Sequence, residues 1–183
     1  MVKSVAVYCG SRNGASDIYI EKAKQLGEEL AKRGITLIYG GSSAGIMGAV
    51  ADSVLANGGK AIGVMPRFLD KREISHKSLS ELIIVETMHE RKAKMAELAD
   101  GFITLPGGAG TMEEFFEVFT WGQIGLHQKP VGLLNINHFY DPLVALLDHM
   151  NKEKFLQDYQ SMVLIDEEPA GLMDQLNGIK HQQ

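Results

Sequence analysis

The strongest structural signal in the chain is residues 101–125, which read GFITLPGGAGTMEEFFEVFTWGQIG. The apolar run at 101–105 is typical of a strand buried on both faces, and a long helical pattern follows at 111–125. Between them, residues 106–110 hold a proline and three glycines, which allow the backbone to turn sharply from strand to helix. The stretch predicts one strand–loop–helix unit of a parallel sheet.

The same succession of a short apolar run and a longer helical pattern recurs along the whole chain. We expect strands at residues 5–9, 35–39, 61–65, 82–85, 101–105, 130–134 and 162–165. We expect helices at 16–33, 44–57, 87–99, 111–125, 142–150 and 167–177, with a loop or broken helix at 67–80. Such alternation with short connections predicts an α/β fold, a Rossmann-like doubly wound parallel sheet with helices on both faces. Because no repeat or change of composition divides the chain, we expect a single nucleotide-binding domain over residues 1–183.

The composition narrows the class of protein. With 45% hydrophobic and 22% charged residues, the chain has the make-up of a globular protein. A net charge of −5 without a long basic run argues against nucleic acid as a partner. The single cysteine, Cys9, cannot form an internal disulfide. No apolar run approaches the ~20 residues that cross a bilayer, and residues 1–8 are too short for a signal peptide, so we expect a cytoplasmic protein without a membrane partner.

Glycine is enriched and clustered. The chain has 20 glycines, and two groups of them follow predicted strands: Gly40, Gly41, Gly45 and Gly48, then Gly107, Gly108 and Gly110. The first group has the glycine spacing of a P-loop, but Ile46 and Met47 stand where lysine and serine or threonine are required. A dinucleotide-binding fold would require an acidic residue at the end of the second strand, and this chain has none there. P-loop nucleotide hydrolysis and NAD-dependent redox chemistry are therefore disfavoured.

The second glycine group predicts an anion site. Three glycines before a helix can turn backbone N–H groups inward, and the first turn of the helix adds free amides and its dipole. A phosphate monoester would suit this loop, with the Thr111 hydroxyl as a further donor. The alternative is structural, because Thr111 and Glu114 have the spacing of a capping box.

A second constellation lies at residues 87–92. Thr87 and Glu90 again have the spacing of a capping box, which places Arg91 and Lys92 near the start of their helix. Cations are unfavourable at the start of a helix, so the presence of these two needs an explanation. They bind an anion, or they belong to a solvated face and pair with nearby glutamates. Since one helix follows the fourth predicted strand and the other follows the fifth, both N-termini face the same edge of the sheet, and Arg91 and Glu114 can converge. The six histidines are isolated in the sequence, so we expect no metal site and no cofactor.

With these motifs the chain resembles the LOG ("Lonely guy") family. Residues 106–114 match the family's P-G-G-x-G-T-x-x-E signature, residues 88–92 match its M-x-x-R-K element, and the turns at 9–11 and 39–41 resemble its other two loops. The resemblance implies hydrolysis of cytokinin riboside 5′-monophosphates to free base and ribose 5-phosphate, with Arg91 and Glu114 as the catalytic pair. It further implies substrate contacts from Glu73, Lys92, Gly107, Gly108, Ala109, Gly110, Thr111, Met112 and Glu113, and from the turns that hold Gly10, Ser11, Gly40 and Gly41.

The residue chemistry agrees with this reaction. Cleavage of an N-glycosidic bond passes through an oxocarbenium-like state, which a carboxylate can stabilise while it activates water. Glu114 is the best candidate, although spacing alone leaves open whether Glu113 or Glu114 faces the ribose. Arg91 keeps its proton, so we expect it to orient Glu114 and the substrate.

The helix at 111–125 also bears on assembly. Its apolar residues spread well beyond one stripe, which favours a homodimer with this helix near the interface over a merely central helix. The family is dimeric as well. Two other functions remain open: a general AMP or purine nucleotide nucleosidase, and a carrier that holds a nucleotide or phosphate cofactor without turnover.

Overall fold

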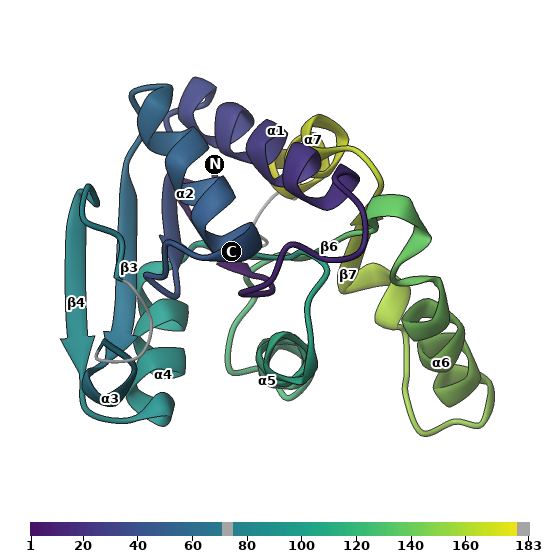
Figure 1. Ribbon diagram of the computed structural model, residues 1–183. Helices are drawn as coiled ribbons and strands as arrows, with labels where there is room; N and C mark the ends of the chain where they lie inside the picture. Colours follow the sequence, from purple (N-terminus) through teal and green to yellow (C-terminus); the bar gives the residue numbers. More distant parts are fainter. Residues whose placement is uncertain (71–74, 179–183) are drawn as a thin grey trace.

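The computed structural model describes residues 1–70 and 75–178 (Figure 1). Its strands are β1 (Ser4–Tyr8), β2 (Thr36–Tyr39), β3 (Ala61–Pro66), β4 (Glu81–Val85), β5 (Gly101–Thr104), β6 (Val131–Leu134) and β7 (Val163–Asp166). Its α-helices are α1 (Ile18–Lys32), α2 (Gly45–Ala56), α3 (Arg67–Asp70), α4 (Met88–Leu98), α5 (Ala109–Gln123), α6 (Asp141–Lys152) and α7 (Pro169–Gly178). Short 3-10 turns lie at Ile136–His138 and Tyr159–Ser161.

Within the described ranges, the seven strands form one parallel sheet in the order β4-β3-β2-β1-β5-β6-β7. The order reverses between β1 and β5, whose register pairs Tyr8 with Thr104. Connections leave this point toward opposite edges of the sheet, so a crevice opens beyond the carboxyl ends of these two strands. The predicted doubly wound α/β fold is confirmed.

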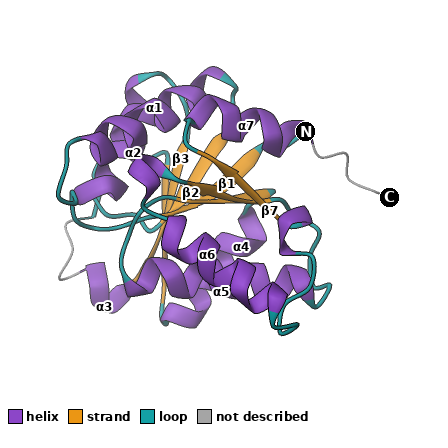
Figure 2. Ribbon diagram, turned by 90° about the vertical axis from the view of Figure 1, so that its right-hand side faces the viewer, coloured by secondary structure: helices purple, strands orange, loops and turns teal. Residues whose placement is uncertain are grey.

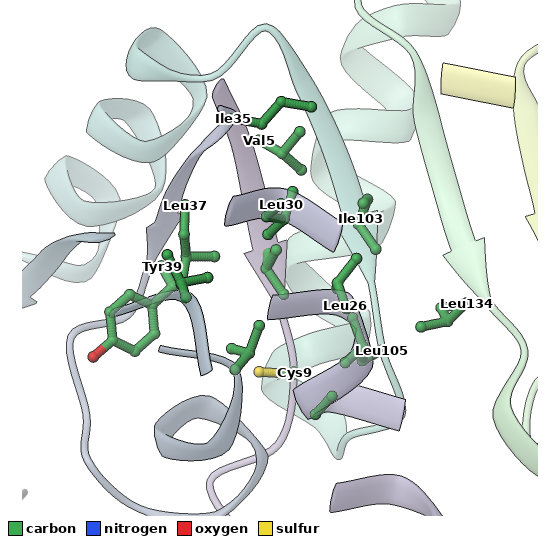
Figure 3. Packing of buried hydrophobic residues seen from close by; sticks show 14 of the residues in the cluster. Val5, Cys9, Leu26, Leu30, Ile35, Leu37, Tyr39, Ile103, Leu105 and Leu134 are labelled. Carbon is green, nitrogen blue, oxygen red and sulfur yellow. The ribbon is translucent and has the colours of Figure 1, made fainter. Parts of the chain in front are cut away.

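Helices cover both faces of the sheet: α1, α2 and α7 lie on one side, and α4, α5 and α6 on the other (Figure 2). Side chains of β1 alternate between two apolar cores, since Val5 and Val7 pack with the first helix group while Ala6 and Tyr8 face the second. Figure 3 shows the first core, where Leu26 and Leu30 of α1 lie against the strands. Burial on both faces explains why the strands are continuous apolar runs.

Two segments refine the prediction. Helix α5 begins at Ala109, two residues earlier than expected, with Gly108 as its N-cap. The segment expected as a loop or broken helix at 67–80 contains the short α3, and Ser75 forms an antiparallel bridge to Ser42. In the described residues, no helix combines the length and apolar character that crossing a membrane demands.

Candidate functional site

Two loops meet at the crevice between β1 and β5. The N–H of Gly10, just after β1, donates a 3.2 Å hydrogen bond to the carbonyl of Pro106, just after β5. A Cβ on Gly10 would lie 3.4 Å from Gly107 Cα, so the backbones are in close contact. The two loops, which are separate motifs in the sequence, therefore form one floor in the structure.

Above this floor is a cavity of about 230 Å³. Ten of the residues predicted for the site line it: Gly10, Ser11, Gly40, Arg91, Lys92, Gly108, Gly110, Thr111, Glu113 and Glu114. The remaining lining residues, which lie outside the predicted set of site residues, are Val7, Cys9, Met47, Met88 and Met95. The lining combines charged and polar groups with the sulfur-containing side chains of Cys9 and three methionines, which suits a ligand with a charged group and a flat apolar ring.

Four predicted contacts lie outside this lining. Gly41 carries a φ of +81° and its carbonyl accepts from His76 N at 3.0 Å, so it shapes the turn after β2. Gly107 lines a neighbouring cavity of about 410 Å³, Ala109 is exposed, and Met112 packs against the second core. Glu73 lies outside the described residues.

Arg91 is fixed by backbone carbonyls. Its side chain is buried, with 6% of the residue exposed; Nε donates to Val64 O at 2.9 Å and Nη2 to Gly40 O at 2.6 Å. A Cβ on Gly40 would stand 2.0 Å from Nη2, so glycine is required where the guanidinium passes. Among the described residues Arg91 forms no ion pair, and its charge therefore remains available to the cavity.

The start of α4 shows half of the predicted capping box: Thr87 caps the helix, but the Glu90 carboxylate accepts from the amide before the cap residue and not from the cap residue's own amide. Thr87 Oγ1 accepts from Glu90 N at 3.1 Å, and the Glu90 carboxylate reaches back to Glu86 N at 2.7 Å. The cap fixes where α4 begins and so places Arg91 one turn inside the helix, facing the cavity.

The capping-box alternative for Thr111 and Glu114 is wrong. Because α5 begins at Ala109, Thr111 lies within its first turn, and the cap residue Gly108 has no side chain to donate or accept. The first amides of α5 have no partner within the helix, and a Cβ at Gly108 or Gly110 would meet nothing within 4 Å. A helix start with free amides and open space is suited to an anion.

Glu114 and Glu113 differ in environment although they are neighbours. Burial raises the pKa of Glu114 to about 7, and the Arg91 charge only partly opposes this rise. The exposed Glu113 carboxylate lies 2.8 Å from Lys92 Nζ, and this partner lowers the pKa of Glu113. A carboxyl group with a near-neutral pKa in a cavity is typical of acid–base chemistry, so Glu114 is the stronger catalytic candidate of the two.

Two parts of the site carry no signal in the sequence. Glu117, one turn beyond Glu113, lies 2.7 Å from the ammonium of Lys92. The neighbouring cavity is lined by Tyr19 and Phe139, whose rings meet edge to face with centroids 6.2 Å apart. These two aromatic residues are distant in the chain, so only the folded structure brings them together.

The chain matches a family described as "possible lysine decarboxylase" over residues 47–176. Cytokinin riboside 5′-monophosphate phosphoribohydrolase LOG of Oryza sativa subsp. japonica is 47% identical over 163 residues, which cover 89% of this chain and 67% of that protein. Cytokinin riboside 5′-monophosphate phosphoribohydrolase of Rhodococcoides fascians is 47% identical over 155 residues, or 84% and 78% of the two chains. A solved molybdenum cofactor binding protein from Rippkaea orientalis has a TM-score of 0.73 at 22% identity, with 97% and 96% of the two chains covered, and shares the fold.

Proposed function

The chain belongs to the LOG family of cytokinin riboside 5′-monophosphate phosphoribohydrolases, and from this premise we propose that it hydrolyses N6-substituted adenosine 5′-monophosphates. The products are the free base and ribose 5-phosphate. The observation that carries the proposal is the cavity lined by both Arg91 and Glu114, which brings a fixed cation together with a carboxyl group whose pKa is near neutral. A passive carrier needs an anion site but not this carboxylate.

The first turn of α5 holds the 5′-phosphate. Its free amides and positive dipole end stabilise the phosphate charge, and the open space at Gly108 and Gly110 lets the phosphate approach the backbone. Lys92 also lines the cavity, and its ammonium, which pairs with Glu113 and Glu117 of α5, adds a positive charge beside this helix. Binding energy at the phosphate, remote from the bond that breaks, fixes the ribose beside Glu114.

Glu114 acts in its ionised form at the ribose. As the N-glycosidic bond breaks, its electron pair goes to the base and positive charge develops on the sugar, which the carboxylate stabilises. The same carboxylate accepts a proton from the water that attacks C1′, the departing base takes a proton from solvent, and Glu114 then returns its proton to solvent. Arg91 does not supply that proton, because a guanidinium does not deprotonate; it orients Glu114 and the substrate.

We also propose further substrate contacts, the domain organisation, the location and the assembly of this protein. We place Glu73 and the turns at Gly10–Ser11 and Gly40–Gly41 on the substrate, and we propose one cytoplasmic domain without a nucleic-acid or membrane partner. We further propose a homodimer built on the outer side of α5. Support comes from Ile124 and Leu126, which follow the partly buried Phe116 and Trp121 and are 66% and 68% exposed. Apolar side chains so exposed at the end of one helix favour a second copy as their cover.

The test is release of base, followed by chromatography, from isopentenyladenosine 5′-monophosphate, AMP and isopentenyladenosine. We expect release from the prenylated monophosphate, little from the riboside, and none from the Glu114→Gln variant. Faster release from AMP would make the protein a general purine nucleotide nucleosidase. Binding of nucleotide without any release of base would replace the hydrolase with a carrier.

A further inference from the structure

Lys92 has two carboxylate partners that differ in exposure. Its ammonium lies 2.8 Å from Glu113 Oε1 and 2.7 Å from Glu117 Oε2, and its own side chain is 11% exposed. The Glu113 side chain is 67% exposed, whereas that of Glu117 is 25% exposed. Both carboxylates raise the pKa of Lys92, so the lysine carries its full charge.

The two carboxylates also differ in their relation to the cavity. Lys92 and Glu113 line it, but Glu117 lies behind the wall and contributes nothing to the lining. Glu117 Oε2 is buried and meets the ammonium outside regular hydrogen-bond geometry, so the contact is an ion pair. A buried carboxylate that lost its cation would be left unpaired in a low-dielectric environment, which is costly. An exposed carboxylate such as Glu113 is solvated readily when its partner leaves.

We propose that Glu117 is the permanent partner of Lys92 and a positioning residue for substrate binding, while Glu113 is the partner that an anionic substrate replaces. Glu117 holds the ammonium at the cavity wall. Glu113 occupies the side of the ammonium that faces the cavity, and it turns to solvent when a nucleoside monophosphate enters. The inference rests on the proposed function, in which Lys92 contacts the substrate.

The exchange has a simple electrostatic basis. Lys92 cannot serve two carboxylates and a phosphate ester equally, since each added anion near one cation repels the others. The anion that is easiest to solvate leaves first, and that is Glu113. Glu117 stays because it is the less exposed of the two carboxylates and its Oε2 atom is buried, so losing the cation would cost it more.

The matched variants are Glu117→Gln and Glu113→Gln, which make the same chemical change at two partners of one lysine. With isopentenyladenosine 5′-monophosphate we expect Glu117→Gln to raise KM by about tenfold, with kcat changed less than about threefold. We expect Glu113→Gln to lower KM, since a competitor for Lys92 is removed. Equal increases of KM in the two variants would overturn the proposal.

A double-mutant cycle tests whether Glu117 acts through Lys92. In the Lys92→Met background, Glu117→Gln should change KM by less than about twofold, because the cation that it positions is gone. A tenfold effect in that background would show a role independent of Lys92 and contradict the proposal. Should Glu117→Gln fail to fold, Glu117→Asp keeps the charge but shortens its reach and should give an intermediate KM.

Calorimetric binding of ribose 5-phosphate separates this inference from the proposed function. The measurement requires no turnover, so it reports on Lys92 even in a protein that releases no base. We expect weaker binding by about tenfold in Glu117→Gln and tighter binding in Glu113→Gln. If the wild-type protein releases no base yet shows this difference, the proposed hydrolysis fails and the role of Glu117 stands.

Discussion

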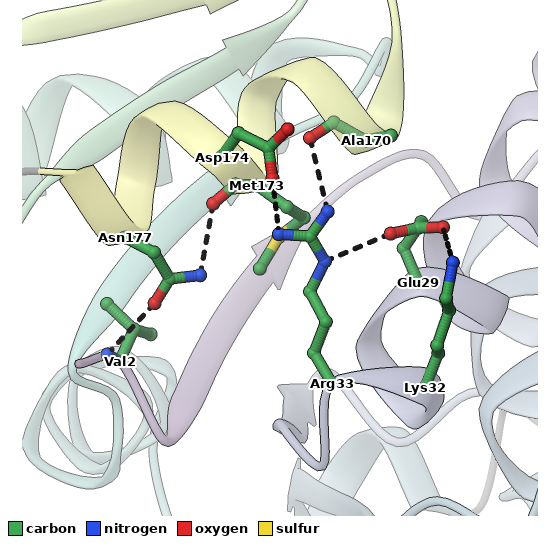
Figure 4. A network of polar contacts seen from close by, with 8 residues as sticks. All are labelled: Val2, Glu29, Lys32, Arg33, Ala170, Met173, Asp174 and Asn177. Atoms are coloured by element: carbon green, nitrogen blue, oxygen red, sulfur yellow. Dashed lines mark hydrogen bonds and ion pairs between the residues drawn. The ribbon is translucent and has the colours of Figure 1, made fainter.

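Arg33 and Arg91 lie at opposite ends of the sheet and are held in opposite ways. Arg33, at the amino ends of the strands, bonds to Glu29 at 2.9 Å and to Asp174 at 2.7 Å, which ties α1 to α7 (Figure 4). Arg91, at the carboxyl ends, bonds to the carbonyls of Gly40 and Val64. Carboxylates neutralise the first charge, whereas carbonyls orient the second charge and leave it unneutralised. We infer that the amino end serves stability and the carboxyl end serves a ligand.

The largest effect should come from Gly40→Ala, which disturbs the position of Arg91. The new Cβ would stand 2.0 Å from Nη2 and 3.0 Å from Met47 Sδ. Because the guanidinium is the end of a flexible side chain, it moves, and the damage falls mainly on activity. We expect kcat/KM to fall by about 100-fold or more, with the free energy of unfolding reduced by about 1–3 kcal/mol. Steady-state kinetics and urea unfolding measure the two effects.

Gly110→Ala is the matched control for the unfolding measurement in that experiment. It adds the same methyl group to the same cavity, but at a position where nothing lies within 4 Å. Because alanine favours a helix over glycine by about 1 kcal/mol, the control should fold at least as well as the wild type. Activity retained in Gly40→Ala would show that catalysis does not require the guanidinium of Arg91 to lie beside Gly40.

The second effect in size should come from Gly107→Ala, beside the first turn of α5. A Cβ there would lie 2.1 Å from Thr111 Oγ1 and 2.9 Å from Gly10 N. The backbone neighbour cannot move as a side chain does, so the loop that holds the phosphate must shift. We expect KM for the monophosphate to rise by about tenfold with a smaller change in kcat. A changed kcat with unchanged KM would place the phosphate elsewhere.

The sequence predicts the frame of this site better than its details. Buried apolar runs give the strands, and topology alone brings Arg91 and Glu114 to one cavity. The carbonyls that hold Arg91 cannot be predicted, since every residue has one and only the folded structure selects Gly40 and Val64. The start of α5 is also misplaced, because Thr111 and Glu114 have capping-box spacing while the actual cap, Gly108, has no side chain. The sequence does not predict Glu117 as part of the site, because a glutamate on a helix is ordinarily a solvated residue.

Glu114 and Glu113 both lie at the carboxyl end of the sheet, yet they should affect the pH dependence of stability in opposite directions. Because burial raises the pKa of Glu114 to about 7, its ionisation opposes folding, and stability is lost as pH rises from about 4.5 to 7. Glu114→Gln should therefore stabilise the protein at pH 8, by at most about 3 kcal/mol, and should not stabilise it below pH 4.5. Lys92 lowers the pKa of Glu113, so Glu113→Gln should destabilise the protein at pH 8. Chemical unfolding at both pH values measures these opposite signs.

The same group sets the pH dependence of catalysis. If Glu114 acts ionised, kcat/KM should rise with pH and level off above about 7, the pKa of the carboxyl in the free protein. Glu113→Gln removes a neighbouring negative charge, so it should move this limb to lower pH. A flat profile between pH 5 and 8 would assign the acid–base step to another group.

The smallest effect should come from Arg33→Gln at the amino end. The substitution removes two ion pairs between partly exposed groups, so we expect a loss of about 0.5–1.5 kcal/mol in the free energy of unfolding. Lys32→Gln is the control, because Lys32 is 77% exposed and lies 3.6 Å from the same Glu29, so its removal should cost almost nothing. Base release should be unchanged in both variants, since neither residue touches the cavity. A loss of activity in Arg33→Gln at full folding would mean that the two ends of the sheet are coupled, and would end the division of roles between the two arginines.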